Sequence, residues 1–120
     1  MKPRINRTKF GSITIDGKTY NHDVLIKLNG EVVKRKKKLS KAVYGSSHTI
    51  SLGEAEFIYE DDAERLILGA GQYGMANLSE AAKRFFKEQD CKVEVLPTPE
   101  AINAWNQSES ETIGLFHITC

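Results

Sequence analysis

The chain has few cysteines and no long apolar run, and these two absences exclude several classes of protein. Its 120 residues include only two cysteines, Cys91 and Cys120, and no C-x-x-C pair, so a disulfide framework is not expected. No apolar run approaches the roughly 20 residues that span a bilayer. The basic start, MKPRINRTKFGS, also lacks the apolar segment of a secretory signal. We therefore expect a cytoplasmic protein in a reducing compartment.

Residues that commonly bind metals are equally sparse. Histidine occurs only at His22, His48 and His117. These histidines and the two cysteines are scattered singly, and no two of them have the spacing of a metal-ligand pair. We therefore expect neither a bound metal nor a cofactor.

The formal net charge of +1 conceals two oppositely charged halves. Residues 1–44 carry twelve Lys or Arg and three Asp or Glu, whereas residues 45–120 carry five and thirteen. Such halves can form two faces of different sign, or can associate head to tail with a second copy. The charge pattern therefore favours a protein partner or self-association.

The most basic stretch runs from Lys34 to Lys41 and has six Lys or Arg in eight residues. Such a run can contact phosphates, but proteins that bind single strands also stack bases on aromatic rings, and only Tyr44 lies nearby. Lysines on an edge strand also keep sheets from associating. We expect a solvated strand end that continues into an irregular connection through residue 50, and we do not expect nucleic acid as a partner.

The first half of the chain has the pattern of antiparallel strands. Asp16-Gly17 and Asn29-Gly30 are dipeptides typical of tight hairpin turns. Apolar residues alternate on both sides of these turns. We expect an antiparallel β-meander over about residues 9–36 with one buried face.

The second half alternates between helical and strand patterns. Ser51 and Glu54 form a capping box, Asn77 to Glu80 resembles another, and Thr98-Pro99 is typical of a helix start. Residues 51–120 thus read α-β-α-β-α-β, which is typical of a mostly parallel sheet covered by helices. We expect a single domain over residues 1–120. The expected elements are helices near 52–60, after residue 77 and after residue 98, and strands at 66–68, 92–96 and 112–119.

Gly69, Gly71 and Gly74 form a G-x-G-x-x-G pattern between an expected strand and an expected helix. In a dinucleotide site the helix begins within such a loop, and an acidic residue follows the next strand. Here the best caps lie three to five residues beyond Gly74, and Glu94 lies inside its strand. The pattern leaves three alternatives open: a dinucleotide loop, a turn whose amides hold another anion, and a purely structural turn.

The reactive side chains give only isolated candidates. His48 lies in a polar turn, GSSH, and we consider Ser47, His48 and the three glycines as candidate ligand-binding residues. His117 and Cys120 lie three residues apart and would point to opposite faces of a strand. His48 with Cys120 is therefore the lowest-ranked catalytic hypothesis.

Five stretches together resemble the adipogenesis-associated domain family, and the similarity extends from about Phe10 to Cys120. This is a family of small domains in archaea, bacteria and eukaryotes, to which a mitochondrial complex I assembly factor is related. The short length and the lysine-rich loop are most similar to archaeal members. The stretches are DGKTYNHDVLI, KKKLSKAVYGSSHTI, LILGAGQYG, VEVLPTPEAINAWN and LFHITC.

The resemblance implies an α/β fold with a central mixed sheet flanked by helices and the N-terminal hairpins packed beside it. It also implies a role in assembly or regulation through binding of other proteins, with no established reaction. The leading hypothesis is a non-enzymatic protein-interaction domain, although the question of an activity stays open. The alternative is binding of an anion or a nucleotide-like molecule at Gly69–Gly74, with His48 nearby.

Overall fold

The computed structural model describes residues 2–120, which fold into four helices and ten strands. Three groups of strands are hydrogen-bonded: a five-stranded sheet, a three-stranded sheet and a two-stranded pair. The elements are β1 Ile5–Lys9, β2 Ser12–Ile15, β3 Lys18–Tyr20, β4 Val24–Ile26, β5 Val32–Lys34, α1 Lys38–Tyr44, β6 Thr49–Ile50, α2 Leu52–Ile58, β7 Arg65–Ala70, β8 Asn77–Leu78, α3 Glu80–Glu88, β9 Lys92–Leu96, α4 Thr98–Gln107 and β10 Thr112–His117.

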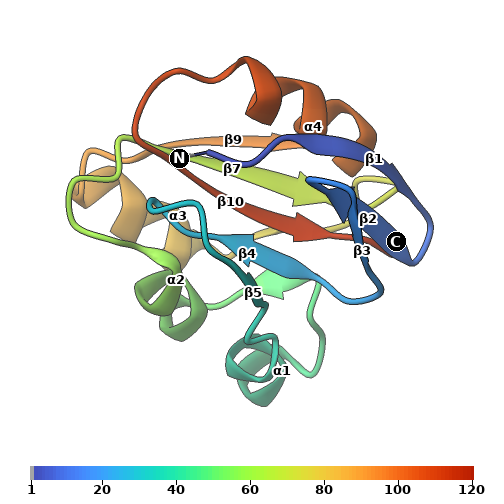
Figure 1. Cartoon of the computed structure of the whole chain (residues 1–120). Helices are drawn as coiled ribbons and strands as arrows, with labels where there is room; N and C mark the ends of the chain where they lie inside the picture. The colour runs from blue at the N-terminus through green and yellow to red at the C-terminus, as the bar shows by residue number, and fades with distance from the viewer. Residues whose placement is uncertain (1) are drawn as a thin grey trace.

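The central sheet has the strand order β5-β4-β10-β7-β9 (Figure 1). Strands β9, β7 and β10 run parallel, whereas β4 and β5 are antiparallel to their neighbours. From β7 the chain moves outward through α3 to β9, and it then returns through α4 across β7 to β10. Because crossovers between parallel strands are right-handed, these opposite directions place α3 and α4 on opposite faces of the sheet.

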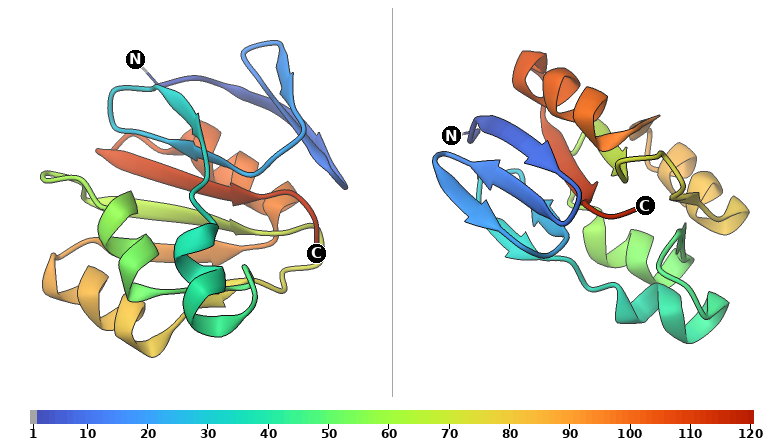
Figure 2. Two further views of the ribbon diagram at one scale, coloured as in Figure 1. Left: turned by 90° about the horizontal axis from the view of Figure 1, so that it is seen from below. Right: turned by 90° about the vertical axis from the view of Figure 1, so that its right-hand side faces the viewer.

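Each face of the central sheet carries its own apolar core, and Figure 2 shows helices on both faces of the sheet. On one face, Leu66 and Leu68 of β7 pack in a cluster with α2 and α3 that includes Phe86. On the other face, Ile67 packs in a cluster with Trp105 of α4 and with the three-stranded sheet. The sequence predicted this architecture, namely a central mixed sheet flanked by helices with N-terminal antiparallel strands beside it, and the structure confirms it.

The predicted meander over residues 9–36 is divided between two sheets. Both hairpins form, but β2 and β3 belong to the small sheet with β1, whereas β4 and β5 extend the central sheet. The chain leaves the small sheet after Tyr20 and enters the central sheet at Val24. All three residues of β4 are buried, as expected of an inner strand covered on both faces. Alternation of apolar residues in the sequence predicts strands, but it does not show which sheet each strand joins.

Residues 38–44 form helix α1 and not the irregular connection that the sequence analysis predicted. Leu39 and Val43 are four residues apart and therefore lie on one helical face. Gly45 ends the helix with φ of 68°, and its N–H donates to the carbonyl of Lys41, which is the left-handed C-terminal cap that glycine favours. The lysine-rich composition had concealed this short helix.

The helix starts of the second half follow the predicted signals with two exceptions. Asn77, the first residue of the expected second capping box, lies in β8, and α3 begins after Ser79. The hydroxyl of Ser51 accepts from the N–H of Glu54 at 3.1 Å, and that of Ser79 accepts from Ala82 at 3.1 Å, as N-caps do. Helix α4, by contrast, begins with Pro97 in the capping position and Thr98 already helical. The Thr98 hydroxyl instead accepts from the N–H of Gly71 and donates to the carbonyl of His117, at the carboxyl edge of the sheet.

Candidate functional site

The carboxyl ends of β7 and β10 meet at one edge of the central sheet, where ligands commonly bind in α/β folds. The chain itself fills this edge, because the turn after β7 packs against residues 118–120. Five amides of the turn are engaged within the protein over distances of 2.7–3.1 Å. The bonds run from Gly71 to Thr98 Oγ1, from Gln72 to the Thr119 carbonyl, from Gly74 to the Gly71 carbonyl, from Met75 to the Cys120 carbonyl and from Ala76 to the Ala70 carbonyl.

Two glycines of the turn allow this close packing. A Cβ on Gly71 would lie 2.5 Å from the carbonyl oxygen of Cys120 and 2.8 Å from Cδ2 of His117, and its φ is +97°. A Cβ on Gly69 would lie 2.8 Å from the ring of Phe116. Real Cβ atoms do not approach so closely. These glycines are needed for close approach within the protein.

A buried group of charged side chains lies beside this edge and has Arg35 at its centre. Arg35 Nη1 donates to Asp23 Oδ2 at 2.9 Å, and Nε and Nη2 donate to the two carboxylate oxygens of Glu54 at 2.7 and 3.0 Å. Nη2 also donates to the Ser47 carbonyl at 2.8 Å. The hydroxyl of Ser40 donates to Glu54. Because every member has partners, the group avoids the large cost of an unpaired buried charge.

Asp23 connects this group to β10. Its Oδ1 accepts from the N–H of Ile118 at 2.9 Å, and its Oδ2 accepts from Nδ1 of His117 at 2.7 Å. Burial by itself would raise the pKa of Asp23, but the hydrogen bonds from His117 and Ile118 and the charges of His117 and Arg35 outweigh it, so the pKa lies below its ordinary value. For Arg35, burial would lower the pKa, but Glu54 and Asp23 raise it above its ordinary value. Both groups are therefore charged at neutral pH.

His117 has a partner on each ring nitrogen. Nδ1 donates to the Asp23 carboxylate, and Nε2 lies 3.2 Å from the hydroxyl oxygen of Thr119, within hydrogen-bonding distance. This is the connectivity of an Asp-His-hydroxyl relay. The arrangement ties Asp23, His117 and Thr119 together at the edge of the sheet.

The predicted ligand-binding residues lie beside this group. The ring of His48 stands edge-on to that of His117, with centroids 5.3 Å apart, and Ser47 contributes its carbonyl to Arg35. Gly69 and Gly71 pack against β10 and residue 120, and Gly74 faces the ring of Pro97. Cys120 is a free thiol, and its backbone contacts the turn.

The sequence pattern did not indicate the charged group itself. Arg35 was included in a lysine run, and Glu54 was noted only as part of a capping box. One signal was available: Arg35 is the only arginine in a run of lysines, and arginine is favoured over lysine in buried ion pairs. In residues 2–120, no cluster of three or more His, Cys, Asp or Glu is placed to hold a metal ion. None of the helices described is long and apolar enough to cross a membrane.

Comparison with known proteins places the chain in a family. A family of proteins of unknown function, DUF498/DUF598, matches residues 5–114. The chain belongs to this family. A comparison with curated proteins finds no match.

Several solved structures share this fold. A conserved hypothetical protein from Pyrococcus horikoshii, PH1505, is 30% identical, with a TM-score of 0.88 over 98% of this chain and 99% of that one. A protein named MT938 is also 30% identical, with a TM-score of 0.83 over 99% and 100% of the two chains. A Bordetella parapertussis protein, at 15% identity and a TM-score of 0.77 over 98% and 96%, shares the fold alone.

Proposed function

We propose that this DUF498/DUF598 domain acts without catalysis, by binding an acidic protein through the surface of α1. This contact surface consists of the lysines at 34, 36, 37, 38 and 41 and the exposed side chains of Leu39, Val43 and Tyr44. The observation that carries the proposal is the exposure of large apolar side chains within a cationic surface. The resemblance to the adipogenesis-associated family, which implies a role in assembly or regulation through binding of other proteins, supports the same role.

The apolar side chains of this surface are unusually exposed for their size. Val43 is 66% exposed, and Leu39, one turn earlier on the same helical face, is 39% exposed. Tyr44 is 45% exposed and follows directly. On α2, Phe57 adds an exposed ring with the ammonium of Lys36 5.9 Å from its centroid. Grouped exposed apolar side chains surrounded by charge are typical of a protein contact surface.

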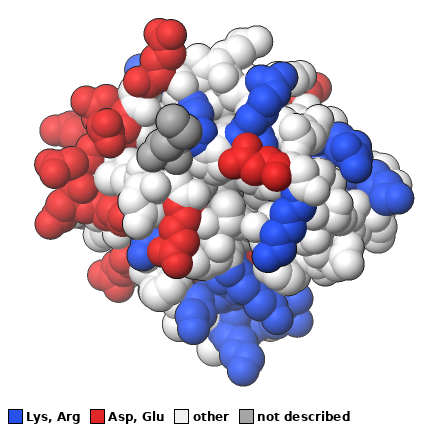
Figure 3. Space-filling view, viewed as in Figure 1, with Lys and Arg blue, Asp and Glu red and all other residues white. Residues whose placement is uncertain are grey.

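The cations of the surface are unmatched within the protein. In residues 2–120, none of its five lysines takes part in a salt bridge. Figure 3 shows basic side chains gathered over α1, and acidic side chains gathered over a different end of the molecule. Among the acidic residues, Glu64 and Glu111 lie side by side, because the N–H of Glu64 donates to the carbonyl of Glu111 at 2.8 Å. A partner with carboxylates around an apolar patch complements the α1 surface in both respects, whereas a nucleic-acid backbone would leave Val43 and Leu39 without an apolar counterpart.

Photo-crosslinking tests this proposal. A benzoyl-phenylalanine placed at position 43 is expected to form a protein adduct in native extract, and mass spectrometry should identify a crosslinked segment rich in Asp and Glu. The adduct should be lost in K36E/K37E/K38E and should weaken with salt. Crosslinker at Val95, a 38% exposed residue of β9, is the matched control and should give no adduct.

Three results would contradict the proposal. They are equal crosslinking at positions 43 and 95, an adduct that survives the charge reversal, and a yield at position 43 no higher than background. An adduct with lipid or nucleic acid at position 43 would also overturn it. An adduct with a second copy of the chain would identify the acidic partner as the protein itself.

We also propose a cytoplasmic location. Cys91 and Cys120 are both free thiols, as is usual for proteins in a reducing compartment. Fractionation of native cells with an antibody to the chain would test this, and recovery in an oxidising compartment would contradict it.

A further inference from the structure

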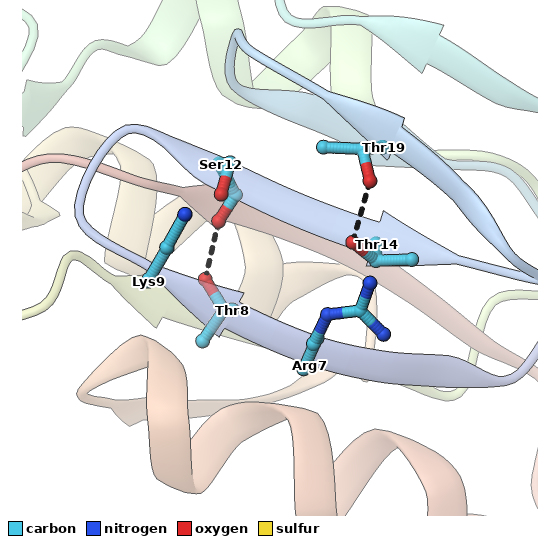
Figure 4. A pocket seen from close by; sticks show the side chains of 6 residues that line it. All are labelled: Arg7, Thr8, Lys9, Ser12, Thr14 and Thr19. Atoms are coloured by element: carbon cyan, nitrogen blue, oxygen red, sulfur yellow. Dashed lines mark hydrogen bonds between the residues drawn. The ribbon is translucent and has the colours of Figure 1, made fainter.

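We propose that the outer face of the small sheet, β1-β2-β3, binds a phosphate-type oxyanion in a hollow beside Arg7 and Lys9. The hollow has a volume of about 170 Å³. Its lining residues bear either a cationic group or a hydroxyl: Arg7, Thr8, Lys9, Ser12, Thr14 and Thr19 (Figure 4). This surface is separate from α1 and does not depend on the interaction proposed above.

An irregularity in β1 places the cations on this face. Ile5 pairs with Ile15, and both are buried against the central sheet. Simple alternation along the strand would turn Arg7 to the same buried face as Ile5. The register shifts between Ile5 and Arg7, so that Arg7 pairs with Thr14. The extra residue in β1 therefore turns the side chain of Arg7 to the face opposite that of Ile5.

Beyond this bulge, each cation stands opposite a hydroxyl-bearing residue. Arg7 pairs with Thr14, and Lys9 pairs with Ser12. Side chains of directly paired residues lie on the same face and are close together. Figure 4 shows both cationic side chains extending from β1 toward β2. Thr14 and Ser12 lie on the outer face but are buried. This is expected of residues at the base of a hollow.

The hollow contains hydrogen-bond donors that the protein does not use. Within residues 2–120, neither Arg7 nor Lys9 forms an ion pair or a side-chain hydrogen bond, and the Ser12 hydroxyl has no partner. The hydroxyls of Thr14 and Thr19 share one hydrogen bond of 2.8 Å. Because each hydroxyl carries one hydrogen, that bond leaves the second hydrogen free to donate. Two cations and two or more free hydroxyl donors therefore surround a space with no carboxylate in its lining.

This donor set identifies the chemistry of the ligand. A guanidinium binds the oxygens of phosphate with matched geometry, and hydroxyl donors from two further strands can bind the remaining oxygens. Small-molecule pockets usually measure about 300–1,000 Å³, so a hollow of about 170 Å³ suits a phosphate or a small phosphomonoester better than a dinucleotide.

A titration followed by amide NMR tests the site. Inorganic phosphate replaces chloride at constant ionic strength and pH 7.5, and the probe is the set of amide shifts of residues 7–19. We expect saturable shifts in this segment, and at least tenfold weaker binding in R7Q/K9Q. The matched control is R84Q/K87Q, which removes the same charge from exposed positions of α3 and should bind like the wild type. Well-dispersed spectra of both variants establish that they are folded.

Two outcomes would overturn the site: shifts that rise linearly without saturation, and equal weakening in R7Q/K9Q and R84Q/K87Q. A third variant, Thr14→Val, removes a hydroxyl without changing charge and should weaken binding by about fivefold, a loss of about 1 kcal/mol for one hydrogen bond. Wild-type affinity in this variant would contradict the hydroxyl contact. Repeating the titration with phosphoserine distinguishes a phosphomonoester ligand from free phosphate. Tighter binding of phosphoserine than of phosphate indicates a phosphomonoester, and equal binding indicates the free anion.

Discussion

Arg35 binds both carboxylate oxygens of Glu54, at 2.7 and 3.0 Å, while each side chain is only 1% exposed. The same guanidinium holds Asp23 through Nη1. One side chain thus joins β4, the start of α2 and, through Asp23, the end of β10. A bidentate pair of this kind needs the planar fork of arginine. The contact joins three parts of the chain that are distant in sequence.

Replacing Arg35 with Met should destabilise the fold strongly. The change leaves the carboxylates of Asp23 and Glu54 buried without their cation, and breaking a buried pair in this way costs about 3–5 kcal/mol. Urea unfolding followed by circular dichroism measures the loss. Lys36→Met, at an exposed neighbouring position, is the control and should change the free energy of unfolding by less than about 0.5 kcal/mol. A loss below about 1 kcal/mol for Arg35→Met would show that the pair is not stabilising.

Asp23 should make the fold sensitive to acid. Its pKa in the folded protein lies below the ordinary value of 3.8. Between these two pKa values the unfolded chain binds more protons, so the free energy of unfolding falls as the pH is lowered through this window. The contribution of Asp23 is fully present above pH 3.8 and is lost below the folded pKa. Urea unfolding from about pH 5 to about pH 2 should show a steeper decline in the wild type than in Asp23→Asn. Equal slopes would contradict this assignment.

The two thiols should react at very different rates. Burial raises the pKa of Cys91 to about 11, and its side chain is buried in the core cluster, whereas Cys120 is partly exposed. Because the thiolate is the reactive form, a thiol reagent at pH 8 should label Cys120 quickly and Cys91 only through unfolding. In Cys120→Ser the fast phase should disappear, and in urea both thiols should react alike. A fast phase that persists in Cys120→Ser would show that Cys91 is accessible.

The sequence predicted the features that depend on neighbouring residues. Ser51 and Ser79 act as helix caps, and Asp16 and Gly17 form the first hairpin turn with positive φ at both positions. Each of these signals lies within about four residues, so its physical cause is visible in the sequence. The alternation of strands and helices in residues 51–120 likewise required only the periodicity of apolar side chains.

The candidate site could not be predicted in the same way. Asp23, Arg35, Glu54 and His117 come from four segments, and no spacing rule connects them. Only the tertiary fold brings Asp23 to His117, 94 residues away. The sheet to which β4 belongs depends on the same long-range contacts, which explains why one predicted meander is divided between two sheets. The sequence analysis grouped Ser47 and His48 with the glycine turn, and nothing in the sequence indicated their contacts with Arg35 and His117.

Gly71 allows a final test, because the protein contains a glycine with similar backbone but empty surroundings. Gly71 has φ of +97° and packs against Cys120 and His117, whereas Gly11 has φ of +86° and nothing within 4 Å of a built Cβ. Gly11→Ala should therefore cost only the left-handed backbone penalty, about 1–2 kcal/mol. Gly71→Ala should cost that amount and a further 1–3 kcal/mol for overpacking. Urea unfolding of both variants isolates the second contribution, and equal losses would show that residues 118–120 move aside without cost. A larger loss at Gly71 would establish that this glycine is needed for the close packing of the turn against the end of the described chain.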